Sequence, residues 1–460
     1  MKILIKNGKV INSDKELNAD ILIDGGKISL IKENINIETE FTIEASNKLV
    51  IPGGIDVHTH LDMPYGDIKT RDDFETGTIA AAFGGTTSII DFAIQSKGQT
   101  LKDSLNIWLD KGKNAVLDFG LHLIITDVNP YVLSEIKEVI EKGVTSFKLF
   151  TAYPNRLMLS DEKIFQVMLK ANENGGLILM HAENGEAIEY LINQALQQGK
   201  KEPIYHALTR PSQLEAEAVY RSIMLASLAD VPIYFVHISS GDAMDVINFS
   251  KQRYEKIFSE TCPHYLLLTE DELRKPNFEG AKYVLSPPLR KKADLKKLWS
   301  AIQKNEIDTI ATDHCPLNFE TDKKLGIDDF TKIPNGGPGI ENRVQLMYHF
   351  GVVEGKISLN RWVELISTNP AKIFGLYPEK GTISVGSDAD IVIWNPDVEH
   401  TISANTHHMN VDYNMFEGFK IKGNAEVVIS NGEIIIQNNK FVGRRGRGKF
   451  LKRKQFELAR

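Results

Sequence analysis

Hydrophobic and polar residues alternate over the first fifty residues in the manner of β-strands. The runs 3–5 and 21–23 are each followed by a turn, Asn7-Gly8 and Asp24-Gly25-Gly26. A period of two with turn residues between the runs is typical of β-hairpins. The pattern returns near the other end of the chain, in segments 391–394, 427–429 and 434–436. Because an isolated hairpin is only marginally stable in water, we expect both ends to form one small β-sandwich domain.

The middle of the chain alternates differently, with apolar runs of strand length separated by amphipathic stretches of helical length. The apolar runs end near His60, Phe92, Thr126, Phe150, His181, His237, Thr261 and Asp313. The helix candidates are 101–111, 132–142, 161–172, 213–228 and 292–302. This alternation predicts parallel βα units, and eight strand ends favour a closed (β/α)8 TIM-like barrel whose first strand is Val50 to Val57. A glycine-rich nucleotide-binding motif, which would favour a doubly wound sheet, is absent from the sequence.

These patterns divide the chain into three parts. We expect a β-sandwich domain from residues 1–52 and 381–440, a barrel from 53–380 and a basic tail from 441–460. Seven of the eleven residues from Arg444 to Lys454 are basic. Such a tail suits either a nucleic-acid arm or a segment that crosses onto a neighbouring subunit.

The composition is that of an ordinary globular protein. The 460 residues include 54 Lys and Arg against 61 Asp and Glu, which gives a net charge of −7. This mildly acidic balance excludes the broad positive field that non-specific nucleic-acid binding requires. The chain has only two cysteines and no signal-peptide or membrane-spanning pattern, so we expect a cytoplasmic protein without disulfides.

Ligand-type side chains follow four of the predicted strands. His58 and His60 lie on one face at the end of the first strand, and His181, His237 and Asp313 each follow an apolar run. Since the carboxyl ends of barrel strands meet at one mouth, these side chains should converge there. Imidazole and carboxylate suit Zn²⁺, and Mn²⁺, Co²⁺ or Fe²⁺ also fit this ligand set.

Lys148 lies inside the apolar strand 146–150, where an unpaired ammonium is costly. One interpretation is a lysine whose charged end reaches solvent at the strand end. The other is a reaction of the amine with CO₂. The resulting carbamate is an anionic oxygen donor that can bridge two metals.

Several motifs resemble those of the dihydropyrimidinase and D-hydantoinase family, within the amidohydrolase superfamily. The resemblance runs nearly from end to end and rests on the segments 52–61, 73–78, 84–87, 180–184, 260–265, 286–290, 311–316, 334–339 and 410–414. It implies a metal-dependent hydrolase that opens the cyclic amide of dihydropyrimidines (dihydrouracil, dihydrothymine) and 5-substituted hydantoins to N-carbamoyl amino acids. In the family the carboxyl terminus helps to assemble a homotetramer, which favours the subunit contact for the basic tail over nucleic acid.

The resemblance also assigns roles to residues. His58, His60 and Asp313 would hold one metal, His181 and His237 the other, and carbamylated Lys148 (N6-carboxylysine) would bridge the two ions, most commonly Zn²⁺. The resemblance further implies that a hydroxide between the metals would attack the amide, that Tyr153 would stabilise the oxyanion, and that Ser286 and Asn335 would contact the ring. Asp313 can pass the proton to the leaving nitrogen. We expect the apolar residues Met63, Tyr65, Phe150 and Leu157 to contact the ring substituent.

Two other interpretations remain open. A sister cyclic amidase, allantoinase or dihydroorotase, would share the metals, and an arginine in the pocket, such as Arg290 or Arg343, would favour dihydroorotase. A non-catalytic scaffold of the same fold would lack metal ligands. A nucleophilic role for Cys315 is disfavoured, because activated water makes a thiol redundant.

Overall fold

The computed structural model describes residues 2–457, and its centre is a barrel of eight parallel strands. These are β6 (Gly54–Thr59), β9 (Thr86–Ile94), β10 (Asp118–Ile124), β11 (Ser146–Phe150), β12 (Leu177–His181), β13 (Ile233–Phe235), β14 (Ile257–Thr261) and β15 (Thr309–Ile310). A parallel bridge between Thr59 and His314 joins the last strand region to the first. The predicted (β/α)8 fold class is confirmed.

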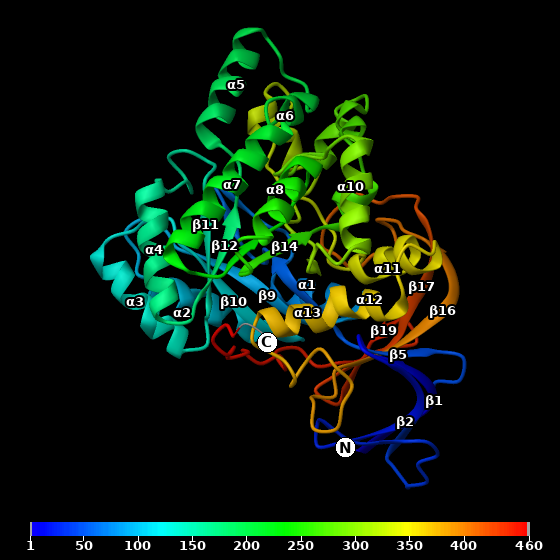
Figure 1. Ribbon diagram of the computed structural model, residues 1–460. Helices are drawn as coiled ribbons and strands as arrows, with labels where there is room; N and C mark the ends of the chain where they lie inside the picture. The colour runs from blue at the N-terminus through cyan, green and yellow to red at the C-terminus, as the bar shows by residue number, and fades with distance from the viewer. Residues whose placement is uncertain (1, 458–460) are drawn as a thin grey trace.

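Helices surround the barrel (Figure 1). They are α1 (Phe74–Phe83), α2 (Leu101–Lys111), α3 (Pro130–Glu141), α4 (Asp161–Glu173), α5 (Gly185–Gln197), α6 (Ile204–Leu208), α7 (Ser212–Ala229), α8 (Gly241–Lys251), α9 (Pro263–Leu267), α10 (Lys292–Gln303), α11 (Arg343–Met347), α12 (Leu359–Val363) and α13 (Asn369–Ile373). Short 3₁₀ or π-helical turns are η1 (Gly112–Asn114), η2 (Glu270–Arg274), η3 (Glu279–Tyr283), η4 (Lys323–Gly326), η5 (Phe330–Lys332), η6 (Tyr348–Val353) and η7 (Glu364–Thr368). The five predicted helices agree with α2, α3, α4, α7 and α10 to within two residues at either end.

The two ends of the chain share one sheet, at the lower right of Figure 1. Its strands are β1 (Lys2–Ile11), β2 (Glu16–Asp24), β3 (Lys27–Lys32), β4 (Phe41–Glu44), β5 (Leu49–Pro52), β16 (Ile391–Thr401), β17 (Lys420–Ser430), β18 (Glu433–Gln437) and β19 (Lys440–Phe441). All of them except β4 form a continuous path in which β5 pairs antiparallel with β16, and β4 pairs with β1 beside this path. Inward side chains from both ends, including Ile5, Val50 and Ile391, form a common hydrophobic cluster.

The first barrel strand is shorter than predicted. The apolar run from Val50 to Val57 is divided at Gly53: β5 belongs to the terminal sheet and β6 to the barrel. A Cβ at position 53 would lie 2.0 Å from the Thr87 Oγ1 atom. The chain therefore passes from the sheet to the barrel at a point where only glycine fits. The apolar pattern could not reveal this break because the residues on both sides are buried.

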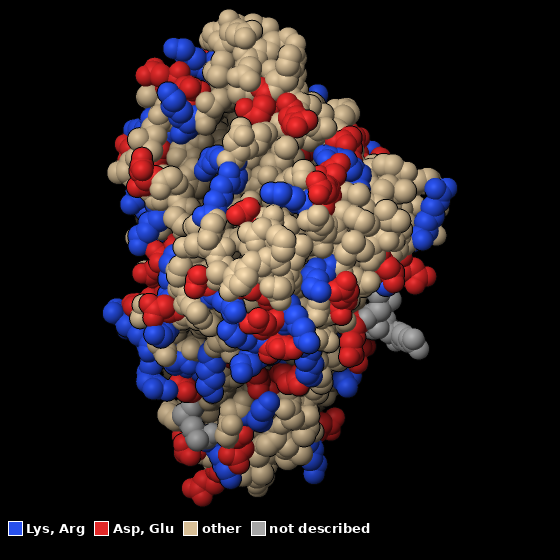
Figure 2. Space-filling view, turned by 90° about the vertical axis from the view of Figure 1, so that its left-hand side faces the viewer, with Lys and Arg blue, Asp and Glu red and all other residues tan. Residues whose placement is uncertain are grey.

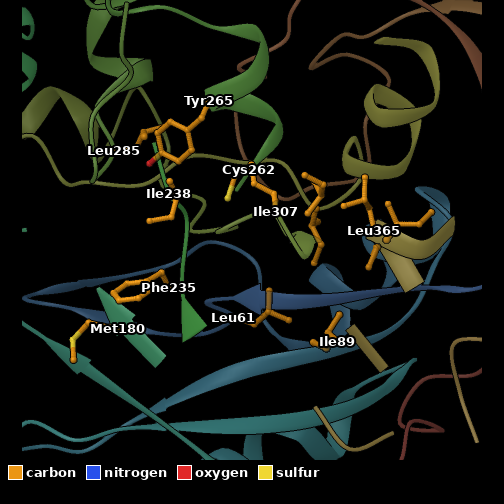
Figure 3. Close-up of a cluster of buried hydrophobic side chains, with 14 of the residues drawn as sticks. Leu61, Ile89, Met180, Phe235, Ile238, Cys262, Tyr265, Leu285, Ile307 and Leu365 are labelled. Atoms are coloured by element: carbon orange, nitrogen blue, oxygen red, sulfur yellow. The ribbon is translucent and has the colours of Figure 1, made fainter. Parts of the chain in front are cut away.

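The hydrophobic core has one part inside the barrel and one between the strands and the helices. Ile90, Phe92 and Tyr234 belong to the inner cluster. Figure 3 shows part of the outer cluster, where Cys262 lies among Ile238, Tyr265 and Ile307. This packing fixes the strand ends from which the site residues project.

The basic tail lies against the barrel of its own chain, as the red segment near β10 in Figure 1 shows. The Phe119 amide donates to the Lys449 carbonyl, and the Leu451 amide donates to the Phe119 carbonyl. Arg453 is buried and donates to the Leu121 carbonyl and to the Ser146 hydroxyl. A contact of the tail with a second subunit remains a prediction, and residues 458–460 lie outside the described part of the chain.

Charges of both signs are mixed on the surface. Figure 2 shows Lys and Arg interspersed with Asp and Glu over the face that it presents. This face therefore shows no continuous positive patch of the kind that nucleic-acid binding requires. Among the described helices, none is long and apolar enough to cross a membrane.

Candidate metal centre and substrate cavity

The six predicted ligand residues lie together at the carboxyl ends of the barrel strands. His58 belongs to β6 and His60 follows it, while Lys148 lies in β11 and His181 ends β12. His237 and Asp313 come two and three residues after β13 and β15, respectively. His60, Lys148, His181, His237 and Asp313 line one cavity, and His58 lies directly beneath it.

The ligand atoms form two adjoining groups. The Asp313 Oδ1 atom lies 3.1 Å from the Nε2 atom of His58 and 3.2 Å from that of His60. The His181 Nδ1 and His237 Nε2 atoms are 3.0 Å apart. The Lys148 Nζ atom lies 3.0 Å from the His58 Nε2 atom, next to the first group. The first group satisfies the geometry of a possible three-ligand metal site.

Three residues at this rim adopt left-handed backbone conformations. The φ angles are 41° for His237, 49° for Asp313 and 64° for Tyr153. Non-glycine residues rarely adopt positive φ, which costs about 1–3 kcal/mol in sparsely populated regions. The strained backbone at these three positions supports the interpretation that the direction of their side chains is important for function.

Two buried carboxylates that the sequence interpretation did not single out orient the imidazoles. The Glu260 Oε1 atom lies 2.7 Å from the His58 Nδ1 atom, and the Glu183 Oε2 atom lies 2.8 Å from the His181 Nε2 atom. In each ring the opposite nitrogen faces the ligand cluster. A carboxylate behind an imidazole fixes its tautomer and raises its basicity as a ligand.

Burial and neighbouring charges set the protonation states of the ligands. Burial lowers the pKa of His60 to about 4, and burial together with His181 holds the pKa of His237 well below its usual value. Burial would raise the pKa of Asp313, but His58 and His60 hold it well below the usual range. The imidazoles of His60 and His237 are therefore neutral and Asp313 is ionised at neutral pH, as metal binding requires.

The donor set fits divalent cations. The nitrogens that face the cluster are the Nε2 atoms of His58, His60 and His237 and the Nδ1 atom of His181. Four imidazoles and a carboxylate at one rim are ligands that suit Zn²⁺ and related ions. Lys148 is fully enclosed, with its Nζ atom 4.3 Å from the centre of the Phe92 ring, and burial lowers its pKa to about 8.

The cavity beside these ligands has a volume of about 120 Å³. This is on the order of the 150 Å³ of an engineered cavity that binds benzene, so one small ring can enter. The predicted substrate-contacting residues all line it: Met63, Tyr65, Phe150, Tyr153, Leu157, Ser286 and Asn335. Burial raises the pKa of Tyr153 above its ordinary value, so its hydroxyl remains a hydrogen-bond donor.

A buried lysine holds the two loops that carry Ser286 and Asn335. The Lys323 Nζ atom donates to the carbonyls of Val284, Pro334 and Gly336 at 2.8, 2.7 and 2.6 Å. The Asn335 side-chain amide in turn donates to the Ser286 hydroxyl at 3.1 Å. The sequence interpretation missed this lysine, because nothing local distinguishes it from the neighbouring surface lysines.

The arginines named as possible carboxylate readers do not line the cavity. Arg290 is paired with Glu215 and Ser239, and Arg343 donates to the Ile310 carbonyl. The arginine that does line the cavity is Arg156, which the sequence interpretation missed. Cys315 also lines it, but burial raises the pKa of its thiol to about 12.

Comparisons with known proteins identify the family to which this chain belongs. Residues 49–435 match the amidohydrolase family. The chain is 48% identical over 455 residues to a D-hydantoinase of Geobacillus stearothermophilus, covering 98% of this chain and 97% of that one. It is also 48% identical over 456 residues to a D-hydantoinase of Streptomyces coelicolor, with the same coverage of each chain. The crystal structure of dihydropyrimidinase from Brevibacillus agri superposes with a TM-score of 0.99 at 49% identity, over 100% of both chains.

Proposed function

The chain belongs to the amidohydrolase family and is a hydrolase of cyclic amides, and we propose that it uses a binuclear metal centre to do so. Water is added across a ring amide of a dihydropyrimidine or a 5-substituted hydantoin. The carbonyl carbon gains the oxygen, the ring nitrogen gains a proton and the C–N bond breaks. The product is an N-carbamoyl amino acid.

The convergence of the ligand residues is the observation that carries this proposal. Residues from five separate strand regions, between 58 and 313 in the sequence, place nitrogen and oxygen atoms about 3 Å apart at the wall of one cavity. A buried histidine in a core needs only a hydrogen-bond partner, which can come from any nearby polar group. Burial alone therefore does not explain why four imidazoles lie together at one rim.

Two divalent ions, with Zn²⁺ favoured, would be held by these residues. His58, His60 and Asp313 would hold one ion, His181 and His237 the other, and Lys148 would contact both as N6-carboxylysine. When bound, the ions lower the pKa of water toward neutrality and polarise the carbonyl. The lowered pKa of Lys148 supports the modification, because a neutral amine adds CO₂ with loss of one proton.

Tyr153 and Asp313 act on the reacting groups. The protonated Tyr153 hydroxyl at the cavity wall donates to the substrate carbonyl oxygen as negative charge develops on it. The Asp313 carboxylate accepts a proton from the attacking water and delivers it to the leaving ring nitrogen. Its low pKa keeps the carboxylate ionised before the substrate enters.

The remaining wall of the cavity positions the ring. Ser286 and Asn335, held together by Lys323, contact the amide groups. Met63, Phe150 and Leu157 contact the substituent at ring carbon 5. We further infer a cytoplasmic homotetramer that acts in pyrimidine catabolism; the free cysteines Cys262 and Cys315 support the reducing compartment.

An activity panel tests the proposal. The metal-loaded protein is assayed with dihydrouracil, 5-methylhydantoin, 5-phenylhydantoin, allantoin and dihydroorotate, and its bound metal is measured. We expect hydrolysis of the first three substrates, about two metal ions per chain, and loss of activity on chelation. A protein that carries no stoichiometric metal, or that hydrolyses only allantoin or dihydroorotate, would contradict the proposal.

A further inference from the structure

Arg156 lines the cavity next to Leu157 and is the cation there that lies outside the ligand cluster. It lies in the loop between β11 and α4, directly before Leu157. Its guanidinium carbon lies 5.6 Å from the centre of the Tyr65 ring, which also lines the cavity. Arg156 is exposed to solvent, so it stands at the mouth of the cavity.

The position of Arg156 is held from both sides. The Tyr153 carbonyl accepts the amide protons of Arg156 and Leu157 at 3.1 Å, which closes the loop as a tight turn. The Tyr65 hydroxyl accepts a hydrogen bond from the Asn335 amide at 3.1 Å, and the Arg156 guanidinium lies over the Tyr65 ring. The guanidinium is thereby linked to the loop that contacts the substrate ring.

Arg156 has no acidic partner in the cavity wall. Among the described residues that line the cavity, Asp313 is the sole carboxylate, and it contacts His58 and His60. The lining of the cavity also includes the apolar residues Met63, Pro64, Ile94, Ile124, Phe150 and Leu157. An apolar wall that ends in an unpaired guanidinium matches a short hydrocarbon chain that ends in an anion.

We propose that Arg156 determines specificity, and that the enzyme prefers cyclic amides whose substituent at ring carbon 5 ends in a carboxylate. An example is 5-(2-carboxyethyl)hydantoin, which the same hydrolysis opens to N-carbamoylglutamate. This inference rests on the proposed cyclic amidase activity. It adds to that activity the chemical class of the substituent.

The test compares two substrates of nearly equal shape, 5-(2-carboxyethyl)hydantoin and its neutral amide, 5-(2-carbamoylethyl)hydantoin. Because the arginine is exposed, we expect the wild type to prefer the carboxylate by roughly two- to fivefold in kcat/KM at low salt. The preference should fall as salt is raised, since exposed charges are screened. Arg156→Gln should reduce the ratio to about one, and Arg156→Lys should retain part of it.

Lys97→Gln provides the matched control. Lys97 donates to the Asn155 carbonyl of the same loop but does not line the cavity. Lys97 lies in the neighbouring loop after β9, so this variant removes the same unit of charge beside the Arg156 loop and should keep the wild-type ratio. Calorimetry provides a second readout: N-carbamoylglutamate should bind more tightly than N-carbamoylglutamine to the wild type, and equally to Arg156→Gln.

Three results would overturn the proposal. They are a wild-type ratio near one, an equal loss on both substrates in Arg156→Gln, and a preference for dihydroorotate, whose carboxylate is attached directly to the ring. An equal loss would mean that Arg156 only supports Tyr65. Failure of the proposed function is distinguishable, because the wild type would then hydrolyse neither hydantoin nor dihydrouracil.

Discussion

At the scale of single residues, Glu260 is the group behind the proposed metal ligands whose removal is most informative. Its Oε1 atom contacts the His58 ring and accepts the His237 amide proton, and its Oε2 atom accepts the Tyr234 hydroxyl proton. Glu260→Gln keeps the shape but removes the charge behind His58. We expect metal affinity to fall by roughly 10- to 100-fold, measured by competition with a chromogenic chelator.

Glu215→Gln serves as the control for that experiment. Glu215 is equally buried, but it contacts Ser239 and Arg290 rather than a ligand imidazole. Its replacement can lower stability but should leave metal affinity unchanged. Equal affinities in Glu260→Gln and the wild type would show that the carboxylate does not tune the ligand.

The two cysteines should be unreactive near neutral pH. Burial raises the pKa of Cys315 to about 12 and that of Cys262 well above its usual value. The thiolate is the reactive form, so at pH 8 a fraction on the order of 10⁻⁴ of Cys315 is reactive, and this fraction rises tenfold per pH unit until about pH 12. Iodoacetamide at pH 8 should leave both the mass and the activity unchanged. Rapid labelling of Cys315 with loss of activity would instead favour a thiol mechanism.

The convergence of the proposed ligand residues could be predicted from the sequence because each lies within, at the end of or shortly after a barrel strand. His181, His237 and Asp313 are polar residues after apolar runs, and barrel geometry brings such positions together. Glu260 could not be predicted as their support, because its partner His58 lies 202 residues away. The position of Arg156 at the cavity mouth likewise depends on Tyr65, which comes from a separate hairpin made of β7 (Pro64–Tyr65) and β8 (Ile68–Lys69).

At the scale of elements, helix periodicity was a better guide than the length of apolar runs. The boundaries of α2 and α4 agree with the sequence pattern because capping side chains begin these helices: Thr100 and Ser160 accept amide protons of their first turns. The run from Val50 to Val57 misled because both neighbouring strands are fully buried. Hydrophobicity cannot show where a chain leaves one sheet for another.

Gly53→Ala tests the passage between the two sheets. The new Cβ would meet the Thr87 side chain at 2.0 Å, with no alternative direction because the atom is fixed by the backbone. We expect the free energy of unfolding to fall by about 1–3 kcal/mol, which is typical of overpacking. Calorimetry should show this as a lower melting temperature. Gly339→Ala is the control, since its nearest neighbour would lie 3.9 Å away. Equal melting temperatures of Gly53→Ala and the wild type would exclude the steric explanation.

At the scale of the whole molecule, the carboxyl-terminal tail packs against barrel strand β10 of its own chain. Truncation after Val442 removes the Phe119 backbone pairing and the buried Arg453. We expect the melting temperature to fall by several degrees, because the amino-terminal ends of β10 and β11 lose their contacts with the tail. We also expect the proposed homotetramer to dissociate in sizing experiments.

Arg453→Met separates the two effects of truncation. This variant removes only the buried guanidinium, which donates to Leu121 and Ser146, and leaves the rest of the tail in place. It should lower the melting temperature without changing the oligomeric state. A truncated protein that remains tetrameric would contradict the subunit contact. The tail would then only stabilise the barrel of its own chain.

The pairing of β5 with β16 has a consequence for synthesis on the ribosome. Leu49 and Val50 find their neighbours at Trp394 and Ile393, more than three hundred residues later in translation. Until those residues emerge, the nascent amino-terminal hairpins present an unsatisfied hydrophobic edge, the kind of surface that aggregates or recruits chaperones. Successful production of this enzyme should therefore depend on protecting its beginning until its end has been made.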